Sequence, residues 1–430
     1  MSTPAYSQST LARTLGLADA VAIGIGAVVG AGIFVVTGVA AGIAGPAFLV
    51  SLAIAGVAAA CNALSSAQLA AEYPQAGGTY EYGYRVLHPW AGFAAGWMFL
   101  ASKAAAAGTV GLGLGAYLAV LAPGVPARGV AVGAVAVFTA LNAWGVRKSA
   151  TANLAIVAVA VASLLVFAGV ALASFDAARL RPFAPEGAGG VMRGAALLFF
   201  AYTGYARVAT LGEEVRDPRT TIPRAIGITV ACALLLYAVV ALAAVCAVGA
   251  PVLAASPAPL AEAARRLPVA GLERVVAAGA VAAMLGVLLS QILGLSRMVF
   301  AMARRGDLPE GLAAVHPRSG APLWAVLLVG AAAGCLAAWG TLRGIAAAAS
   351  FAILVYYGIA NLAALRMPRA AKRFPDAVPA VGLVSCAALA VSLAPGTMAA
   401  GVATLAAGFV VRAAVRSFGA KGLAGRGGDG

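Results

Sequence analysis

The sequence predicts an all-α polytopic membrane protein with about twelve transmembrane helices. Of its 430 residues, 63% are hydrophobic and only 10% are charged, whereas soluble domains are about 25% charged. Its uncharged stretches are also long, and the longest cover residues 20–71, 225–261 and 377–411. A helix needs roughly 20 apolar residues to cross a bilayer, so each of these stretches holds one or two spans.

Each span is placed on an apolar stretch between charged residues or turn signals. The twelve spans cover residues 17–41, 46–70, 90–121, 129–146, 150–175, 193–212, 225–249, 274–303, 322–341, 344–365, 377–394 and 397–414. Between spans seven and eight, a short surface helix is expected to begin after Pro259. Residues 1–14 form a polar tail without a signal-peptide pattern, and the glycine-rich tail 417–430 is predicted to be disordered.

The basic residues predict the orientation of the spans. With the N-terminus inside, 19 of the 29 Lys and Arg residues fall in segments predicted to be cytoplasmic and eight in external ones. Cytoplasmic loops are enriched in Lys and Arg, so both termini are predicted to be cytoplasmic in a bacterial-type cytoplasmic (inner) membrane. The net charge of +15 is spread over short loops, without the basic platform that nucleic-acid binding needs.

Two spans contain glycines that favour a break in the helix. The first span carries Gly30-Ala31-Gly32, and the sixth carries Tyr202-Thr203-Gly204-Tyr205. Non-helical backbone inside a membrane is tolerated where it lines a cavity, and two broken helices at corresponding places mark the central site of a transporter. Unwinding at 30–32 would free N–H groups beside a helix start, where they can hold a carboxylate. Close helix packing through small residues is the competing explanation.

The second break offers groups that suit an ammonium ion. The carbonyls of Ala201, Tyr202 and Thr203 would be free to accept hydrogen bonds, and Phe199, Phe200 and Tyr202 would form the walls of a pocket. Ordinary aromatic packing between helices would explain the same aromatic side chains.

Charged residues inside two spans are further candidates. Lys103 lies near the middle of span three, where a lysine costs a few kcal/mol unless it meets water or a partner. It would act as a fixed cation in place of sodium, as a proton-carrying amine, or as the structural partner of a carboxylate. Arg207 stays charged, so a structural pair with Glu213, Glu214 or another helix is favoured over proton transfer.

The sequence offers no catalytic or metal-binding constellation. His88 and His316 both precede prolines in predicted loops and form no cluster. The five cysteines lie in apolar stretches without paired spacing, so we expect them to be small residues of the membrane core. We therefore predict no enzyme activity, no metal site and no cofactor.

Four motifs, in order, resemble those of the amino acid–polyamine–organocation (APC) superfamily of secondary transporters. They are GIGAVVGAGIF at 24–34, EYPQAGGTYEYGY at 72–84, FFAYTGYARVATLGEEVRDPRTTIPRAI at 199–226 and LGLSRMVFAMARRGDLP at 293–309. The resemblance implies one transporter domain (15–416) with a five-plus-five inverted repeat (LeuT-like). The repeats would cover about 15–175 and 190–366, with broken helices 1 and 6 and two extra helices at about 377–414.

The resemblance also implies roles for the residues at the breaks. The backbone of Gly30, Ala31 and Gly32 would hold the α-carboxylate of a substrate. The carbonyls around Phe200, Ala201 and Thr203 would hold its α-amine, with Tyr202 as an aromatic gate or pocket wall. The loop EYPQAGG would lie on the cytoplasmic side and help to close the inner exit.

The chain departs from some members of the superfamily. Certain proton-coupled relatives carry a lysine in the middle of span five, where this chain has Ala160. Lys103 is the candidate to replace that cation. Members that bind cationic substrates often present a carboxylate after the span-six break, where this chain has Ala206 and then Arg207. Ser290, with Gln291 and Ser296, would face the site that a sodium ion occupies elsewhere, unless these residues make ordinary interhelical hydrogen bonds.

The expected function is secondary active transport of amino acids by alternating access. Proton-coupled uptake of small neutral amino acids is favoured because span three is rich in alanine, with sodium as the other candidate ion. The alternatives are an amino acid exchanger and an amine or polyamine transporter. A channel or a transporter-like sensor is disfavoured because the spans offer few polar residues to line a pore. The expected partners are the amino acid and the lipid bilayer.

Overall fold

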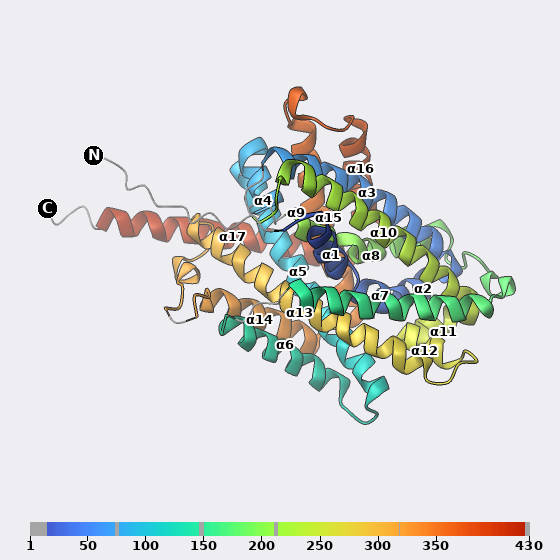
Figure 1. Cartoon of the computed structure of the whole chain (residues 1–430). Helices are drawn as coiled ribbons and strands as arrows, with labels where there is room; N and C mark the ends of the chain where they lie inside the picture. The colour runs from blue at the N-terminus through green and yellow to red at the C-terminus, as the bar shows by residue number, and fades with distance from the viewer. Residues whose placement is uncertain (1–14, 74–76, 146–149, 210–213, 318, 426–430) are drawn as a thin grey trace.

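The computed structural model describes residues 15–73, 77–145, 150–209, 214–317 and 319–425 (Figure 1). Within these ranges the regular elements are helices, and the extended pairing is one isolated bridge between Leu15 and Val215. Seven helical stretches are long and apolar enough to cross a membrane: Leu17–Glu72, Pro89–Leu121, Ala152–Ala173, Pro218–Val248, Leu272–Arg304, Leu342–Arg366 and Pro395–Ser417. The chain is therefore an all-helical, multi-pass membrane protein.

The first of these stretches is interrupted twice. Helix α1 (Leu17–Val28) is followed by a π-helical segment, η1 (Gly32–Val36), which continues into α2 (Thr37–Ala44). A 3-10 turn, η2 (Gly45–Ala47), then leads into α3 (Phe48–Glu72). Gly45 has φ 59° and its Cβ would lie 2.6 Å from Pro185 Cδ, so only glycine suits this corner.

The remaining helices follow in chain order. They are α4 (Thr79–Tyr82), η3 (Gly83–Leu87), α5 (Pro89–Leu121), α6 (Ala127–Ala143), α7 (Ala150–Ala173), η4 (Ala177–Leu180), α8 (Gly187–Tyr202), η5 (Thr203–Tyr205), α9 (Ala206–Ala209), α10 (Pro218–Val248), α11 (Ala250–Ala255), α12 (Pro259–Arg265), α13 (Leu272–Arg304), η6 (Glu310–Ala313), α14 (Leu323–Trp339), α15 (Leu342–Arg366), η7 (Arg369–Ala371), α16 (Ala377–Val391) and α17 (Pro395–Gly425).

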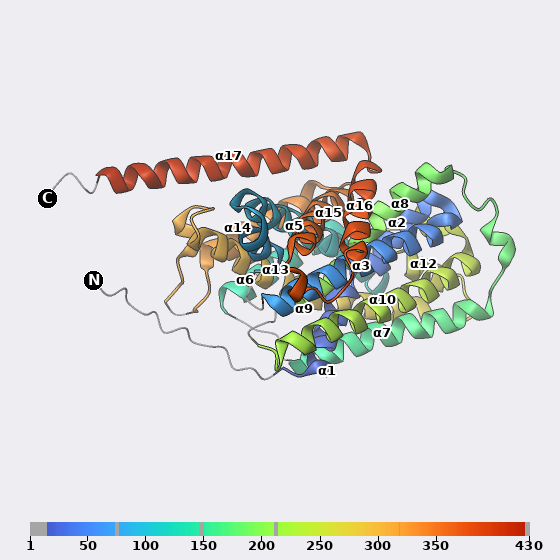
Figure 2. The same cartoon turned by 90° about the horizontal axis from the view of Figure 1, so that it is seen from above.

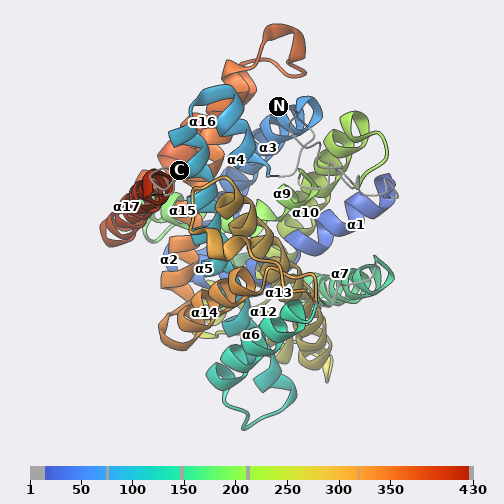
Figure 3. The same ribbon diagram turned by 90° about the vertical axis from the view of Figure 1, so that its left-hand side faces the viewer.

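The broken helices lie inside the bundle, and long helices pack around them. Helix α1 packs against α10 and α7, and α8 packs against α3 and α15. Helix α5 contacts α15, α13 and α6, and Figure 3 shows α6 and α14 side by side at one edge of the bundle. Alanine and glycine dominate these contacts, so the backbones approach closely, as is usual between membrane helices.

Helix α17 lies along one side of the bundle (Figure 2) and contacts α15 and α5. Most of its surface is exposed, although Arg412 is buried. The helix continues to Gly425, into the segment after 417 for which the composition predicts disorder. Residues 426–430 and the predicted tail 1–14 lie outside the described residues.

The loop helix after span seven begins at Pro259, as predicted, but it is not a surface helix. In α12, Leu260, Ala261 and Ala264 are fully buried. The Leu260 N–H donates to the hydroxyl of Tyr117 at 3.3 Å. The apolar face of α12 covers η1 and α13, so the helix closes one end of the bundle.

The cysteines divide between the core and the outer surface. All five are free thiols, Cys246 and Cys386 are buried, and Cys232 and Cys335 are exposed. Cys232 and Cys335 lie on outward faces of the apolar helices α10 and α14, where they would face lipid.

Candidate functional site

The two helix breaks cross each other at the centre of the bundle. Helix α1 ends at Val28, Val29 is extended with ψ 100°, and the helix resumes at Gly32. Helix α8 ends at Tyr202 and passes through a 3-10 turn before α9. A Cβ on Gly204 would lie 2.2 Å from Ala27 O, and one on Gly32 would lie 2.5 Å from Ala201 Cα. Glycine is required here because backbone meets backbone.

A small cavity lies where the breaks meet. Its volume is about 30 Å³, which is room for two or three water molecules at roughly 10–15 Å³ each. Of the residues singled out from the sequence, those that line it are Gly30, Ala31, Gly32, Lys103, Phe200, Ala201, Thr203, Gly204 and Gln291. The structure therefore brings together both breaks and the lysine of span three, as a central binding site requires.

Lys103 points from α5 toward the broken part of span six. Its Nζ lies 3.3 Å from the hydroxyl oxygen of Thr203 and 3.5 Å from the Thr203 carbonyl oxygen. It also lies 5.9 Å from the centre of the Phe99 ring. Within the described ranges, no carboxylate lies within 4.0 Å of this ammonium. The lysine is therefore held by backbone and hydroxyl oxygens, and its predicted role as partner of a carboxylate finds no support there.

Thr203 is the residue on which several of these contacts converge. Its hydroxyl donates to Phe200 O at 2.9 Å, and its carbonyl also accepts from the Tyr357 hydroxyl at 3.4 Å. The carbonyl that the resemblance assigns to the substrate amine thus already has two donors, one of them a cation.

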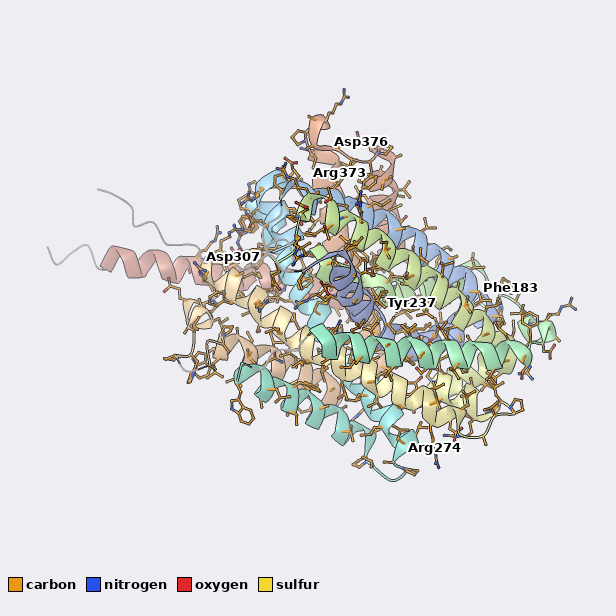
Figure 4. The ribbon with its side chains drawn as sticks, viewed as in Figure 1. Phe183, Tyr237, Arg274, Asp307, Arg373 and Asp376 are labelled. Atoms are coloured by element: carbon orange, nitrogen blue, oxygen red, sulfur yellow. The ribbon has the colours of Figure 1, made fainter. Side chains whose placement is uncertain are left out.

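Tyr237 of α10, which sequence analysis missed, holds the two breaks together (Figure 4). Its hydroxyl oxygen lies 2.8 Å from Val28 O and 3.2 Å from Ala201 O, and its side chain is fully buried. The single phenolic proton can serve either carbonyl. The sequence does contain a signal for this role, since Tyr237 is the one tyrosine in the uncharged span 225–249. A buried tyrosine hydroxyl usually needs a hydrogen-bond partner.

We expect Tyr237→Phe to lower thermal stability and transport together. The change leaves a buried carbonyl of the breaks without a donor, which costs about 1–3 kcal/mol. Thermal unfolding and uptake of the purified protein measure both effects. Tyr202→Phe is the matched control because its hydroxyl makes only a 3.4 Å contact with Leu52 O. Equal behaviour of the two variants would contradict the bridging role of Tyr237.

Span eight presents Gln291, not Ser290, to the cavity. Gln291 lines the cavity and its Nε2 donates to Lys103 O at 2.6 Å. The Ser290 hydroxyl instead donates to Gly286 O in its own helix at 2.5 Å, and Ser296 bonds Leu293 O at 3.0 Å. The hydroxyls of these two serines therefore serve the backbone of their own helix.

Other predicted residues lie away from the cavity. Tyr202 does not line the central cavity; it lines a second cavity together with residues of α3 and α10. Arg207 packs against α13, since a Cβ on Gly294 would lie 2.7 Å from its Nη1. Glu213 lies outside the described residues. Among those that are described, no three His, Cys, Asp or Glu side chains form a metal site.

A second polar group of residues, here called the inner cluster, joins α4 and η3 to the C-terminal end of α13 and to the middle of α17. It consists of Tyr80, Glu81, Tyr84, Arg305, Asp307 and Arg412. Asp307 is fully buried and accepts from Tyr80 Oη and from Arg412 Nε, both at 2.9 Å, and from Tyr84. Burial beside this carboxylate raises the pKa of Tyr84 to about 12, so its phenol remains a donor.

Arginines complete the inner cluster. Arg305 Nη2 lies 2.8 Å from Glu81 Oε2, and its guanidinium lies 4.3 Å from the centre of the Tyr84 ring. Arg412 stacks 4.9 Å from the Phe93 ring. The resemblance predicts that the preceding loop EYPQAGG lies at the inner exit, but these partners come from three distant segments and carry no local sequence signal.

Comparison with known proteins agrees with this architecture. The amino acid permease family matches residues 19–420. An uncharacterized transporter of Mycobacterium tuberculosis is 46% identical over 403 residues, covering 93% of this chain and 90% of that protein. The branched-chain amino acid permease BcaP of Bacillus subtilis is 31% identical over 348 residues, covering 75% of this chain and 74% of that protein. The methylthioribose transporter of the same bacterium is 31% identical over 385 residues, covering 83% and 81%.

These matches are to transporters and not to enzymes, and they cover nearly the whole membrane domain. They agree with the resemblance carried by the four motifs. The chain belongs to the amino acid permease family of membrane transporters, within the APC superfamily.

Proposed function

We propose that the protein takes up small neutral amino acids by alternating access, coupled to protons, across a bacterial cytoplasmic membrane with both termini inside. The observation that carries the proposal is the crossing of the two breaks around a cavity lined by Gly30–Gly32, Thr203 and Lys103. The relative named as a branched-chain amino acid permease supports a neutral substrate. Ala106 and Val110 of α5 also line the cavity and suit a small apolar side chain.

The breaks suit the two charges of an amino acid. The start of η1 presents N–H groups that have no partner within that helix, and a helix start favours a carboxylate. The carbonyls of Phe200, Ala201 and Thr203 favour an ammonium group. Because the present cavity is too small for an amino acid, the substrate enters only when the surrounding helices or side chains move apart, as alternating access requires.

Lys103 provides a physical route to coupling. Its ammonium lies at the Thr203 carbonyl, where the substrate amine would bind, so two cations compete for one group of oxygens. Uptake driven by protons requires the proton and the substrate to be bound together, so in this scheme Lys103 yields the Thr203 carbonyl to the substrate amine and keeps its proton beside the Thr203 hydroxyl, 3.3 Å away. In this scheme Lys103 serves the role that the resemblance assigns to a lysine of span five.

We expect Lys103→Met to abolish uptake or remove its pH dependence without unfolding the protein. Methionine keeps a similar length and removes the charge. Uptake into proteoliposomes from pH 5 to 8, with thermal unfolding as the check on folding, tests this. Lys372→Met is the control, because Lys372 pairs with Asp376 outside the site. Wild-type rates at every pH would exclude Lys103 from coupling.

We also propose twelve spans and the inverted repeat. Seven long spans become twelve when Leu17–Glu72 counts as two, the three shorter apolar helices α6, α14 and α16 are added, and the interrupted α8–α9 run is included. The packing has the symmetry that a repeat predicts: α1–α10 corresponds to α8–α3, α5–α15 to α13–α7, and α5–α6 to α13–α14.

The proposed function is tested by ligand stabilisation and then by uptake. A ligand that binds the folded state raises its apparent stability by mass action. We expect a few small neutral amino acids to raise the melting temperature of the purified protein, and their decarboxylated amines not to do so. Uptake of the stabilising amino acid into proteoliposomes with an inward proton gradient follows. Stabilisation by amines alone would overturn the carboxylate site.

A second candidate function is transport of a solute without a carboxylate. The relative named as a methylthioribose transporter covers more of this chain than the named amino acid permease does. With such a solute, Lys103 would remain at Thr203 throughout the cycle. Stabilisation by methylthioribose and by none of the twenty amino acids would favour this candidate.

A further inference from the structure

A larger cavity lies on the outer surface of the bundle, between α3 and α10. It has a volume of about 510 Å³ and runs past Leu49, Gly56 and Leu242 to Tyr202, which forms its inner end. Apart from the tyrosine, its walls are aliphatic side chains and glycine. Here it is called the α3–α10 groove.

The groove opens toward the bilayer. Val57 is 58% exposed and Leu235 is 70% exposed at its rim, although both belong to helices that are long and apolar enough to span the membrane. Val50 and Val239 continue the exposed apolar surface beyond it. Exposed apolar side chains on membrane-spanning helices contact the hydrocarbon core of the bilayer, so the groove is continuous with the lipid-facing surface of the protein.

We propose that the α3–α10 groove binds one hydrocarbon chain of a membrane lipid and that its occupancy is coupled to the central site. Water is a poor occupant because the aliphatic walls offer no hydrogen-bond partners, and an empty groove loses dispersion contacts. A headgroup is also a poor occupant, because the one polar tip in the groove, Tyr202 Oη, lies 3.4 Å from the Leu52 carbonyl. An acyl chain needs no hydrogen-bond partner, and it makes the dispersion contacts that an empty groove lacks.

Glycine opens the path to the inner end of the groove. A Cβ on Gly56 would lie 2.3 Å from Leu234 Cδ2 and 3.6 Å from Tyr202 Oη. A larger residue there would displace Leu234 and narrow the groove beside the tyrosine.

Tyr202 connects the groove to the breaks. Its ring centre lies 5.2 Å from that of Tyr237, and the Tyr237 hydroxyl reaches Val28 O and Ala201 O. A shift of α8 against α3 and α10 therefore changes the groove and the central site together. A ligand shifts such an equilibrium by its different affinities for the two states, so a bound chain favours one conformation. This coupling rests on the proposed transport, whereas the binding site itself does not.

Photolabelling tests the site. The purified full-length protein in nanodiscs is titrated with a phosphatidylcholine that carries a diazirine in the middle of one acyl chain, and labelled peptides are mapped by mass spectrometry. We expect saturable labelling of the α3 and α10 peptides that line the groove. Ala53→Phe and Ala238→Phe place bulk into it from exposed alanines, and each should reduce this labelling at least about fivefold, a typical coupling or competition factor.

Ala332→Phe is the control, because Ala332 is exposed on α14, away from the groove. It should leave the α3 and α10 labelling unchanged, and a thermal melt confirms that each variant is folded. The proposal would be overturned if the labelling did not saturate or if both filling variants retained it. Either result would mean that lipid contacts this surface without a specific site.

The coupling is measured separately. Uptake is compared in proteoliposomes whose phospholipids differ only in acyl-chain length. We expect the uptake rate of the wild-type protein and of Ala332→Phe to depend on chain length, and that of both filling variants to be independent of it. Equal dependence in all four proteins would overturn the coupling. If the proposed substrates are not transported at all, the labelling experiment still tests lipid binding in the groove independently.

Discussion

Gly204→Ala is expected to abolish transport and to destabilise the fold, although it adds only one methyl group. The new Cβ would lie 2.2 Å from Ala27 O and 2.4 Å from Val28 N. Overpacking a core costs about 1–3 kcal/mol when side chains can adjust. Here the neighbours are backbone atoms of the first break, so the two broken helices must separate and the cost lies at or above the upper end of that range.

The measurement compares thermal unfolding and uptake with those of Gly227→Ala. A Cβ on Gly227 of α10 meets nothing within 4 Å, so the same chemical change should be neutral or slightly stabilising, by up to about 1 kcal/mol from helix propensity. Wild-type uptake by Gly204→Ala would show that the breaks do not need to touch.

The same argument changes the expected cause of a defect in Gly32→Val. If the backbone of Gly30–Gly32 holds a carboxylate, this valine would block substrate binding sterically. In the structure the added Cβ would first meet Ala201, 2.5 Å from its Cα, so the variant forces α8 away as well. Gly30→Ala separates the two effects, because its Cβ would meet only a methyl group of Val287 at 3.1 Å. It should keep the fold and weaken ligand stabilisation.

Asp307→Ala is expected to have the second large effect. Asp307 and the Arg412 side chain are 0% and 3% exposed, and removing one partner of a buried ion pair costs about 3–5 kcal/mol. Tyr80 and Tyr84 would lose their acceptor at the same time. The contacts that hold α4, η3 and α17 to Asp307 would be lost together, so we expect low thermal stability and little transport.

Asp376→Ala is the matched control (Figure 4 labels both residues). Asp376 pairs with Lys372, but its side chain is 58% exposed, and exposed pairs contribute about 0–1 kcal/mol. Thermal unfolding in detergent should therefore separate the two variants clearly. Similar melting temperatures would show that the inner cluster does not hold α17 to the C-terminal end of α13.

Local sequence patterns were sufficient to locate the two helix breaks, whose backbone forms part of the site. Gly30–Gly32 and the segment after Tyr202 were identified because glycine and polar residues interrupt apolar stretches, and the structure breaks both helices there. Lys103 was identified because a charge inside a span is rare. The side of α8 that Tyr202 faces was not predictable, because a local pattern does not specify which face of a broken helix points to the cavity.

Composition and hydropathy by themselves determined that this is a helical membrane protein, and glycine placement determined where two of its helices break. Hydropathy and glycine placement can both be recognised within short stretches of neighbouring residues. Only the tertiary structure decided that Tyr237 bridges the breaks, 209 residues from Val28, and that Arg412 pairs with Asp307, 105 residues away. Such contacts depend on which faces of which helices meet, and that is set by packing of the whole bundle, which no single segment encodes.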